Sequence, residues 1–357
     1  MHILKGYTKQ EISWMMYDWA NSAHSVIIVT LLPIFFDTVA GYTADSVSSM
    51  STWGYATSIA MLIVALAAPF LGVFGDIRGM RKKLFSFFML LGVAACAGMA
   101  FTPGMDFTSG PVAAGKVASL ILVLYIVSVI GFDASAIYYD AFLTDVTTED
   151  RMDKVSTMGY GLGYIGGSTI PLLIFLIMNL VGVPMLTCLA FVFGLTAVWW
   201  LAFSLPLLKN CEQTSGKPYE KGDVARSIKG VGTTIKEIIA NKPMLIYILS
   251  YFFYIDGVHT VISMATTYGT NLGLDSTGMM LALLLVQILG LPFCLLYIKC
   301  SEKFGARTMV GFGICVYMFI CIFAFFMNSL WQFWVLAVLC ATSQGGIQAL
   351  SRSMFGK

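Results

Sequence analysis

Ionisable side chains lie inside apolar segments of this chain, where a charge is costly. The first apolar segment holds Asp18, Asn21 and His24, and a later one holds Asp256 and His259. An ionised group in the middle of a membrane-spanning helix costs about 2.5–3.5 kcal/mol on insertion scales, so it usually faces a water-filled cavity or a partner. These five residues are our candidates for a substrate or proton pathway.

Asp256 and His259 are three residues apart and therefore share one face of a helix. Burial favours the neutral form of a carboxyl group, and a nearby histidine favours its charged form. Such a pair can bind and release a proton during a transport cycle. A hydrogen-bonded pair that fixes helix packing explains the same spacing equally well, and the sequence leaves both interpretations open.

Asp18, Asn21, Ser22 and Ser25 follow one another at helical spacing and lie on one helix face. If this face borders a cavity, it can bind a solute or act as a gate. If it borders another helix, the same side chains supply interhelical hydrogen bonds. The same two interpretations apply to His24, which lies deeper in the segment.

A second group of charged residues lies at the ends of apolar segments. Asp76 is followed by Arg78 and Arg81, and Asp140 ends another segment. A carboxylate beside fixed cations can hold two helices together by charge-assisted hydrogen bonds, and breaking them would free the helices to move. We therefore predict that these four residues form gates. The alternatives are a plain basic anchor at the membrane surface and, for Asp140, a solvated side chain.

The sequence carries no motif of a metal centre or of a known catalytic site. Its eight cysteines form no CxxC pair and no zinc-spaced cluster with histidine. Walker-type, HExxH and GxSxG motifs are also absent. We therefore predict no metal, no cofactor and no enzymatic activity, and the net charge of +2 gives no reason to expect a nucleic-acid partner. An intramembrane enzyme built on two joined aspartates and a non-transporting receptor or scaffold stay open as alternatives.

Membrane-spanning helices must position these residues. Charged residues make up 11% of the 357 residues, where soluble domains have about 25%, which is too few to cover a water-soluble protein. A bilayer-spanning helix needs about 20 mostly apolar residues. We therefore expect an all-α membrane protein with ten spans, which lie near residues 13–36, 51–74, 84–102, 117–140, 157–180, 184–206, 243–270, 277–299, 308–328 and 331–351.

The basic residues predict the orientation of these spans. With the N-terminus in the cytoplasm, every lysine and arginine except Lys116 falls on the cytoplasmic side, as is usual for membrane proteins. We therefore expect an integral, multi-pass protein whose lipid-facing helices contact the bilayer. The long connection 207–242 contains an amphipathic helix that either links two bundles or binds a regulatory partner. Its apolar positions are Val224, Ile228, Val231, Ile235 and Ile238.

The chain contains an internal repeat. Residues 76–81 follow the second span and residues 302–307 follow the eighth, and both read acid-x-x-Gly-x-Arg. Similar residues also open spans one and seven and close spans four and ten. This order predicts two pseudo-repeated six-helix bundles, at 1–206 and 243–357, joined by the loop 207–242. The second bundle has counterparts of four helices only, so we expect it to be incomplete, with its last two helices missing.

These motifs together resemble the major facilitator superfamily. Residues 72–82 are similar to its signature between helices two and three, with Ile77 in place of a basic residue. Residues 17–22 resemble the opening motif of the family related to the autophagy-linked vacuolar amino-acid effluxer, in which Asn is commoner than Asp140. Further similar motifs lie at 139–143, 163–167, 254–260 and 344–352.

The resemblance implies the major facilitator fold and a secondary active transporter of a small solute that works by alternating access. An amino acid is the solute implied by analogy with the fungal members, and a proton is the candidate coupling ion. The short loops are typical of bacterial members, so we expect the protein in the bacterial cell membrane.

Overall fold

The computed structural model describes residues 4–43, 49–216, 218 and 223–357, without the side chains of 29, 223–229 and 234. Ten helical segments within these residues are long and apolar enough to cross a membrane, as the sequence predicted. The fifth segment contains α6, a π-helical turn labelled η4, and α7. The ten segments are built from α1 (Lys9–Ala40), α2 (Ser49–Gly75), α3 (Met80–Met99), α4 (Pro111–Ala141), α6 (Met152–Leu162), η4 (Gly163–Ser168), α7 (Thr169–Leu180), α8 (Met185–Asn210), α10 (Lys242–Asn271), α11 (Ser276–Phe304), α12 (Ala306–Phe325) and α13 (Leu330–Gly356).

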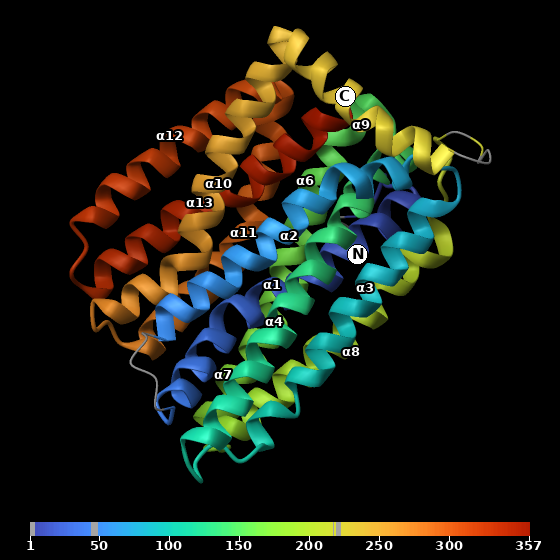
Figure 1. The fold of residues 1–357 in the computed structure, drawn as a ribbon. Coiled ribbons are helices and arrows are strands. Elements are labelled where there is room, and N and C mark those ends of the chain that lie inside the picture. Colours follow the sequence, from blue (N-terminus) through green and yellow to red (C-terminus); the bar gives the residue numbers. More distant parts are fainter. Residues whose placement is uncertain (1–3, 44–48, 217, 219–222) are drawn as a thin grey trace.

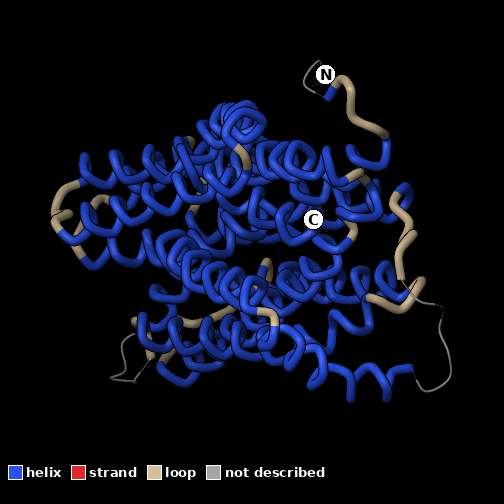
Figure 2. Tube along the Cα trace, turned by 90° about the horizontal axis from the view of Figure 1, so that it is seen from above, coloured by secondary structure: helices blue, strands red, loops and turns tan. Residues whose placement is uncertain are grey.

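Among the described residues, three short helices lie at the ends of these segments and one helix of 18 residues lies in the long connection. They are η2 (Thr102–Gly104), α5 (Leu143–Val146), η3 (Glu149–Arg151) and α9 (Asp223–Ala240). The α9 helix lies in the long connection and contacts α2 and α10, so the predicted helix forms there. Val224 and Ile228, two of its predicted apolar positions, have side chains outside the described part. Figure 2 shows that all regular structure in the described chain is helical.

The helices begin where the sequence provides caps. A capping box joins Thr8 and Glu11 at the start of α1, and a second joins Ser329 and Gln332 at the start of α13. Gly79 and Gly305 precede α3 and α12, and both have φ of 83°, a left-handed value that favours glycine. The two glycines share this φ but differ in ψ, which is −4° at Gly79 and 149° at Gly305, so the two copies of the acid-x-x-Gly-x-Arg motif make different backbone turns.

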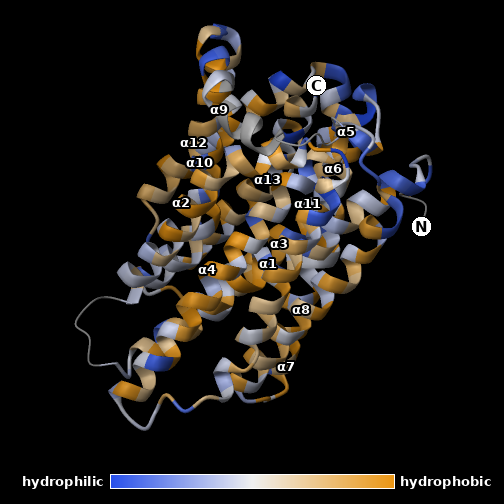
Figure 3. Cartoon of the chain, turned by 45° about the vertical axis from the view of Figure 1, so that its right-hand side comes forward, coloured by the Kyte–Doolittle hydropathy of each residue, from blue (hydrophilic) through white to orange (hydrophobic). Residues whose placement is uncertain are grey.

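The helices pack around two hydrophobic cores. One core joins α1–α8, the first bundle, and also takes in residues of α11 such as Leu291 and Ile298. The other joins α10–α13, the second bundle, around residues such as Val258 and Leu350. Figure 1 shows the orange and red second bundle beside the blue-to-green first bundle. Figure 3 shows hydrophobic residues along the helices and hydrophilic ones gathered near both termini.

Small residues let helices of the first bundle approach closely. A Cβ atom on Gly166 would collide with the indole ring of Trp19, and one on Gly167 would collide with the Trp19 carbonyl oxygen. The π-helical turn around these glycines is one of the irregularities that interrupt long helices, often near functional sites. It lies against α1, beside the turn that carries Asp18 and Ser22.

Candidate functional site

Arg352 of α13 lies buried among residues of the first bundle. Its Nη2 donates to Asp18 Oδ2 at 3.0 Å, and its Nη1 lies 3.3 Å from Asp18 Oδ1. The same Nη1 also donates to Asp140 Oδ1 at 3.4 Å. Both terminal nitrogens of the guanidinium thus bind the Asp18 carboxylate of α1. One of these nitrogens, Nη1, also binds the Asp140 carboxylate of α4, and among side chains only arginine offers this fork of donors.

Arg352 is also bound to α6. Its Nε donates to Ser156 Oγ at 2.8 Å and its Nη2 to the Ser156 carbonyl oxygen at 2.9 Å. Ser156 Oγ in turn donates to the Ala349 carbonyl oxygen at 2.8 Å. We call Asp18, Asp140, Ser156 and Arg352 the Arg352 cluster, which joins three segments of the first bundle to the second.

Aromatic rings surround the guanidinium of Arg352. Its central carbon lies 4.5 Å from the Trp14 ring centroid, 4.4 Å from that of Tyr160 and 5.3 Å from that of Tyr139. Trp14 Nε1 donates to the Tyr139 carbonyl oxygen at 2.9 Å and fixes one of these rings. Arginine stacks on aromatic faces in this way while its edge donates hydrogen bonds.

A second contact joins the bundles one turn beyond the Arg352 cluster. Asp153 of α6 accepts from Ser353 Oγ at 2.6 Å and from Lys357 Nζ at 2.8 Å. These bonds and the cluster hold α6 and α13 together at the end of the molecule that carries both termini.

The charges of the Arg352 cluster do not cancel. It holds two carboxylates and one guanidinium, and the side chain of Asp18 is 7% exposed while that of Asp140 is 48% exposed. Asp18 is thus the buried partner of Arg352, and Asp140 is the partner that water can reach.

A cavity of about 390 Å³ lies between α1 and the second bundle. Ser25 and Thr30 of α1, Gln287 of α11 and Gln344 of α13 line it together with apolar side chains, and no charged residue is among its described lining. Gln287 is 7% exposed, and its Oε1 has no hydrogen-bond partner within the described chain. Ser25 is seven residues from Asp18, which is roughly 10 Å along the helix, so the cavity and the cluster are neighbours.

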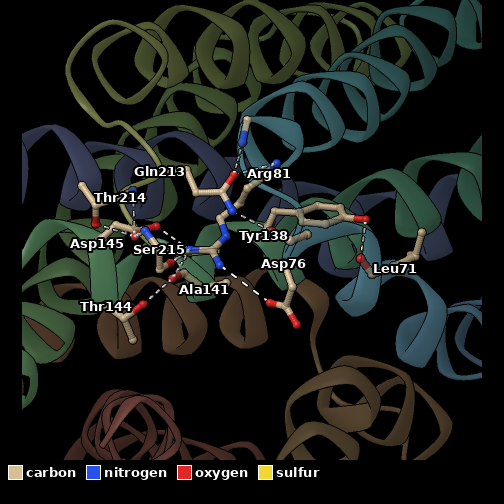
Figure 4. A network of polar contacts seen from close by, with 12 residues as sticks. Leu71, Asp76, Arg81, Tyr138, Ala141, Thr144, Asp145, Gln213, Thr214 and Ser215 are labelled. Atoms are coloured by element: carbon tan, nitrogen blue, oxygen red, sulfur yellow. Dashed lines mark hydrogen bonds and ion pairs between the residues drawn. The ribbon is translucent and has the colours of Figure 1, made fainter. Parts of the chain in front are cut away.

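Arg81 lies at the N-terminal end of α3, in a separate group of polar residues that we call the Arg81 cluster and that includes Asp145 and Ser215 (Figure 4). Its Nη1 donates to the carboxylate of Asp145, to the Ala141 carbonyl oxygen at 3.0 Å and to Ser215 Oγ at 3.2 Å. Asp76, the partner expected from the sequence, has an 82% exposed side chain whose Oδ1 is 3.9 Å from Arg81 Nη2. The stronger partner of Arg81 is therefore Asp145, which the sequence analysis did not single out.

The first residues of the long connection bind to this Arg81 cluster. Gln213 Oε1 accepts from the backbone N–H of Gly79 at 2.9 Å, and Asp145 Oδ1 accepts from the backbone N–H groups of Thr214 and Ser215 at 3.0 and 2.9 Å. Burial of the preceding Cys211 raises the pKa of its thiol to about 12. The connection thus begins as a fixed part of the first bundle.

The structure brings the predicted residues Asp18 and Asp140 together at Arg352, and it places the predicted gate residues Asp76 and Arg81 3.9 Å apart. Asn21 is buried one turn from Asp18 on α1. Arg78 is exposed, and its part in a gate stays a prediction.

The predicted histidines lie outside the cavity lining. The His24 ring lies 4.7 Å from that of Phe132 and 5.1 Å from that of Trp200, inside the first bundle, and neither ring nitrogen has a hydrogen-bond partner within the described residues. Asp256 and His259 are exposed on α10, and His259 Nε2 lies 3.4 Å from Gln348 Nε2. Roles for these residues in a pathway stay predictions.

Comparison with known proteins decides the family. Residues 42–357 match the family described as "Vacuole effluxer Atg22 like". The chain belongs to this Atg22-like family. The MFS-type transporter YxiO of Bacillus subtilis strain 168 is 42% identical over 363 residues, which cover 99% of this chain and 82% of YxiO. Autophagy-related protein 22-1 of Penicillium rubens is 23% identical over 57% of this chain and 38% of its own length.

Solved structures show the fold of this Atg22-like chain. The proton:xylose symporter XylE of E. coli, bound to 6-bromo-6-deoxy-D-glucose, matches 98% of the chain and 85% of XylE with a TM-score of 0.66 and 15% identity. The chain has the major facilitator fold and is an integral, multi-pass membrane protein of a transporter family. Its relatives are named as transporters or effluxers, and the chain is not an enzyme.

Proposed function

We propose that this Atg22-like protein is a secondary active transporter that moves a small solute by alternating access. The observation that carries the proposal is a cavity between α1 and the second bundle that lies beside a charged cluster joining the two bundles. In such transporters a central site opens to one side at a time as the two bundles rock.

The Arg352 cluster supplies the closure at the end of the molecule that carries both termini. Arg352, Ser353 and Lys357 of the second bundle contact Asp18, Asp140, Asp153 and Ser156 of the first. Rocking of the bundles would break these contacts and open the cavity to this side. The basic residues predict that this side is the cytoplasm and that the protein lies in the bacterial cell membrane.

An amino acid is the first class of solute to test, because the sequence resembles the vacuolar amino-acid effluxer. Ser25, Thr30, Gln287 and Gln344 offer hydrogen bonds to such a solute. A proton is the proposed source of energy for transport. The division into bundles 1–206 and 243–357 with the connection 207–242 fits this mechanism.

Uptake into proteoliposomes tests the proposal. The purified chain is reconstituted, and labelled amino acids are added one at a time with and without a pH gradient. We expect at least one to accumulate above the level of protein-free liposomes, and to accumulate further with the gradient. No uptake of any amino acid would overturn the amino-acid assignment, and no uptake across a wider panel of sugars, peptides and organic cations would overturn transport itself.

A further inference from the structure

We propose that Asp18 and Asp140 form a proton-binding site that fills when Arg352 leaves them, so that a proton on the first bundle replaces an arginine of the second. The role of this proton in transport rests on the proposed function. The site differs from the Asp256–His259 pair that the sequence pointed to.

The negative and positive charges of the Arg352 cluster come from different bundles. Both carboxylates belong to the first bundle, on α1 and α4, whereas the only cation bonded to them in the described chain is Arg352 of α13 in the second bundle. Separation of the bundles therefore separates the positive charge from two negative ones. Both carboxylates lie within hydrogen-bond distance of the same Nη1, so they are close neighbours.

Two neighbouring carboxylates without a cation repel each other, and burial adds to the cost of their charge. Binding one proton removes the repulsion and reduces the burial cost to that of a single charge, and the protonated and the ionised carboxyl group can then share a hydrogen bond. Arg352 stays protonated throughout, since a guanidinium does not lose its proton in proteins. The proton comes from water and is returned to water, and no other bond is made or broken.

The exposure of the two side chains gives the order of events. Asp140 is 48% exposed and can take a proton from water while the bundles are still joined. Its protonation removes one of the ionic bonds of Arg352 and leaves the bonds to Asp18 and Ser156. Asp18, at 7% exposure, can exchange a proton only after Arg352 has moved.

Within the described residues, the other titratable side chains that face the cluster from the surrounding helices are tyrosines and one cysteine. Tyrosine and cysteine side chains titrate near pH 10 and pH 8.5, roughly, well above carboxylates. Asp153 and Asp145 each have their own cation, Lys357 and Arg81. The tyrosines and the cysteine that face the cluster are Tyr17 of α1, Tyr139 of α4, Tyr160 of α6, Tyr164 of η4, Tyr251 of α10 and Cys294 of α11.

The sign of the pH effect follows from linkage. The open form has two carboxylates without a cation and binds more protons than the closed form, so a fall in pH favours the open form. A distance between labels on the two bundles reports this change without any solute. Exposed Lys83 of α3 and Lys303 of α11, replaced by an unnatural amino acid that carries the label, report on the end of the molecule that holds the cluster.

The experiment follows the label distance in the full chain in lipid nanodiscs from about pH 8 to about pH 4, a range that ends near the ordinary pKa of an aspartate side chain. In the otherwise unchanged chain we expect the distance to increase as the pH falls. Asp140→Asn should abolish most of this response, and Asp140→Glu should keep it. Asp133→Asn is the matched control, because Asp133 lies seven residues earlier on α4 and is not bonded to Arg352 in the described structure.

The outcomes separate this proposal from the proposed function. Loss of the response in Asp133→Asn or Asp256→Asn, with a normal response in Asp140→Asn, would overturn the proton site. Solute uptake by a chain whose label distance ignores pH would also overturn the site but leave transport standing. A pH response that depends on Asp140, in a chain that moves no solute, would support the site and count against transport.

Discussion

At the scale of single residues, the structure explains how charges are tolerated inside an apolar chain. Arg352 makes hydrogen bonds to Asp18, Asp140 and Ser156 and stacks on aromatic rings, so its charge is compensated although it is buried. The cost of a buried ion predicted that Asp18 faces either a water-filled cavity or a partner, and the structure shows the partner. The identity of the partner could not be predicted, because Asp18 and Arg352 are 334 residues apart in the sequence.

Replacement of Arg352 by lysine tests the geometry of the cluster. Lys keeps the positive charge but loses the two-nitrogen contact to Asp18 and the stacking on Tyr160 and Trp14. We expect Arg352→Lys to lower the free energy of unfolding by about 1–3 kcal/mol, the usual range for hydrogen bonds to charged groups. Thermal unfolding in nanodiscs measures this, with Arg307→Lys at an exposed position as the control. Equal free energies of unfolding for Arg352→Lys and Arg307→Lys would contradict the hydrogen-bond geometry described for Arg352.

The Oε1 atom of Gln287 has no hydrogen-bond partner within the described chain, which predicts that Gln287 binds the solute rather than stabilises the fold. Gln287→Leu removes a buried polar atom without a partner, so stability should stay equal or rise. The KM for the transported solute should rise about tenfold, which corresponds to the loss of one hydrogen bond. Uptake kinetics and thermal unfolding of the same preparation measure both effects. A fall in stability with an unchanged KM would make Gln287 a packing residue.

At the scale of the helices, the sequence predicted most of the structure. All ten spans form, because a long apolar stretch in a membrane must satisfy its backbone hydrogen bonds within a helix. The π-helical turn from Gly163 to Ser168 was not predicted. Apolar content and length are the same for an α-helix and a helix with such a turn, so only the contact with Trp19 of α1 distinguishes them.

Two glycines in helices test how closely these elements pack. A methyl group on Gly166 would collide with Trp19, whereas a methyl group on Gly72 of α2 would meet no atom within 4 Å. Gly166→Ala should therefore lower the stability by about 1–3 kcal/mol, as overpacking usually does. Gly72→Ala should leave it unchanged or slightly raised, because Ala is the better helix former. Thermal unfolding compares the two, and a destabilised Gly72→Ala with a neutral Gly166→Ala would contradict the packing.

At the scale of the whole molecule, the internal repeat predicted two bundles, and the described helices pack around two hydrophobic cores. The pairing across the bundles was harder to predict. Asp76 is five residues from Arg81 in the sequence, yet the stronger partners of Arg81 are Asp145 and the start of the long connection. Charged residues at helix ends have several possible partners at similar distance, and only the packing of α3, α4 and α8 selects among them.

The orientation in the membrane is a prediction of the charge distribution. Reporter fusions after residues 80, 148, 225 and 304 should report the cytoplasm, because every lysine and arginine except Lys116 lies on that side. Fusions near residues 109 and 274 should report the opposite side. A cytoplasmic signal at 109 would contradict the assigned orientation.

A reversible bond between the bundles tests most directly whether their separation is required for transport. Asp153 of α6 and Ser353 of α13 are in contact, with Ser353 Oγ 2.6 Å from Asp153 Oδ1, so cysteines at both positions should form a disulfide on oxidation. Solute uptake by the double variant Asp153→Cys/Ser353→Cys is measured before oxidation, after oxidation and after reduction, with each single variant as a control. We predict that oxidation stops uptake only in the double variant and that reduction restores it. Full uptake by the completely cross-linked chain would contradict alternating access by these two bundles.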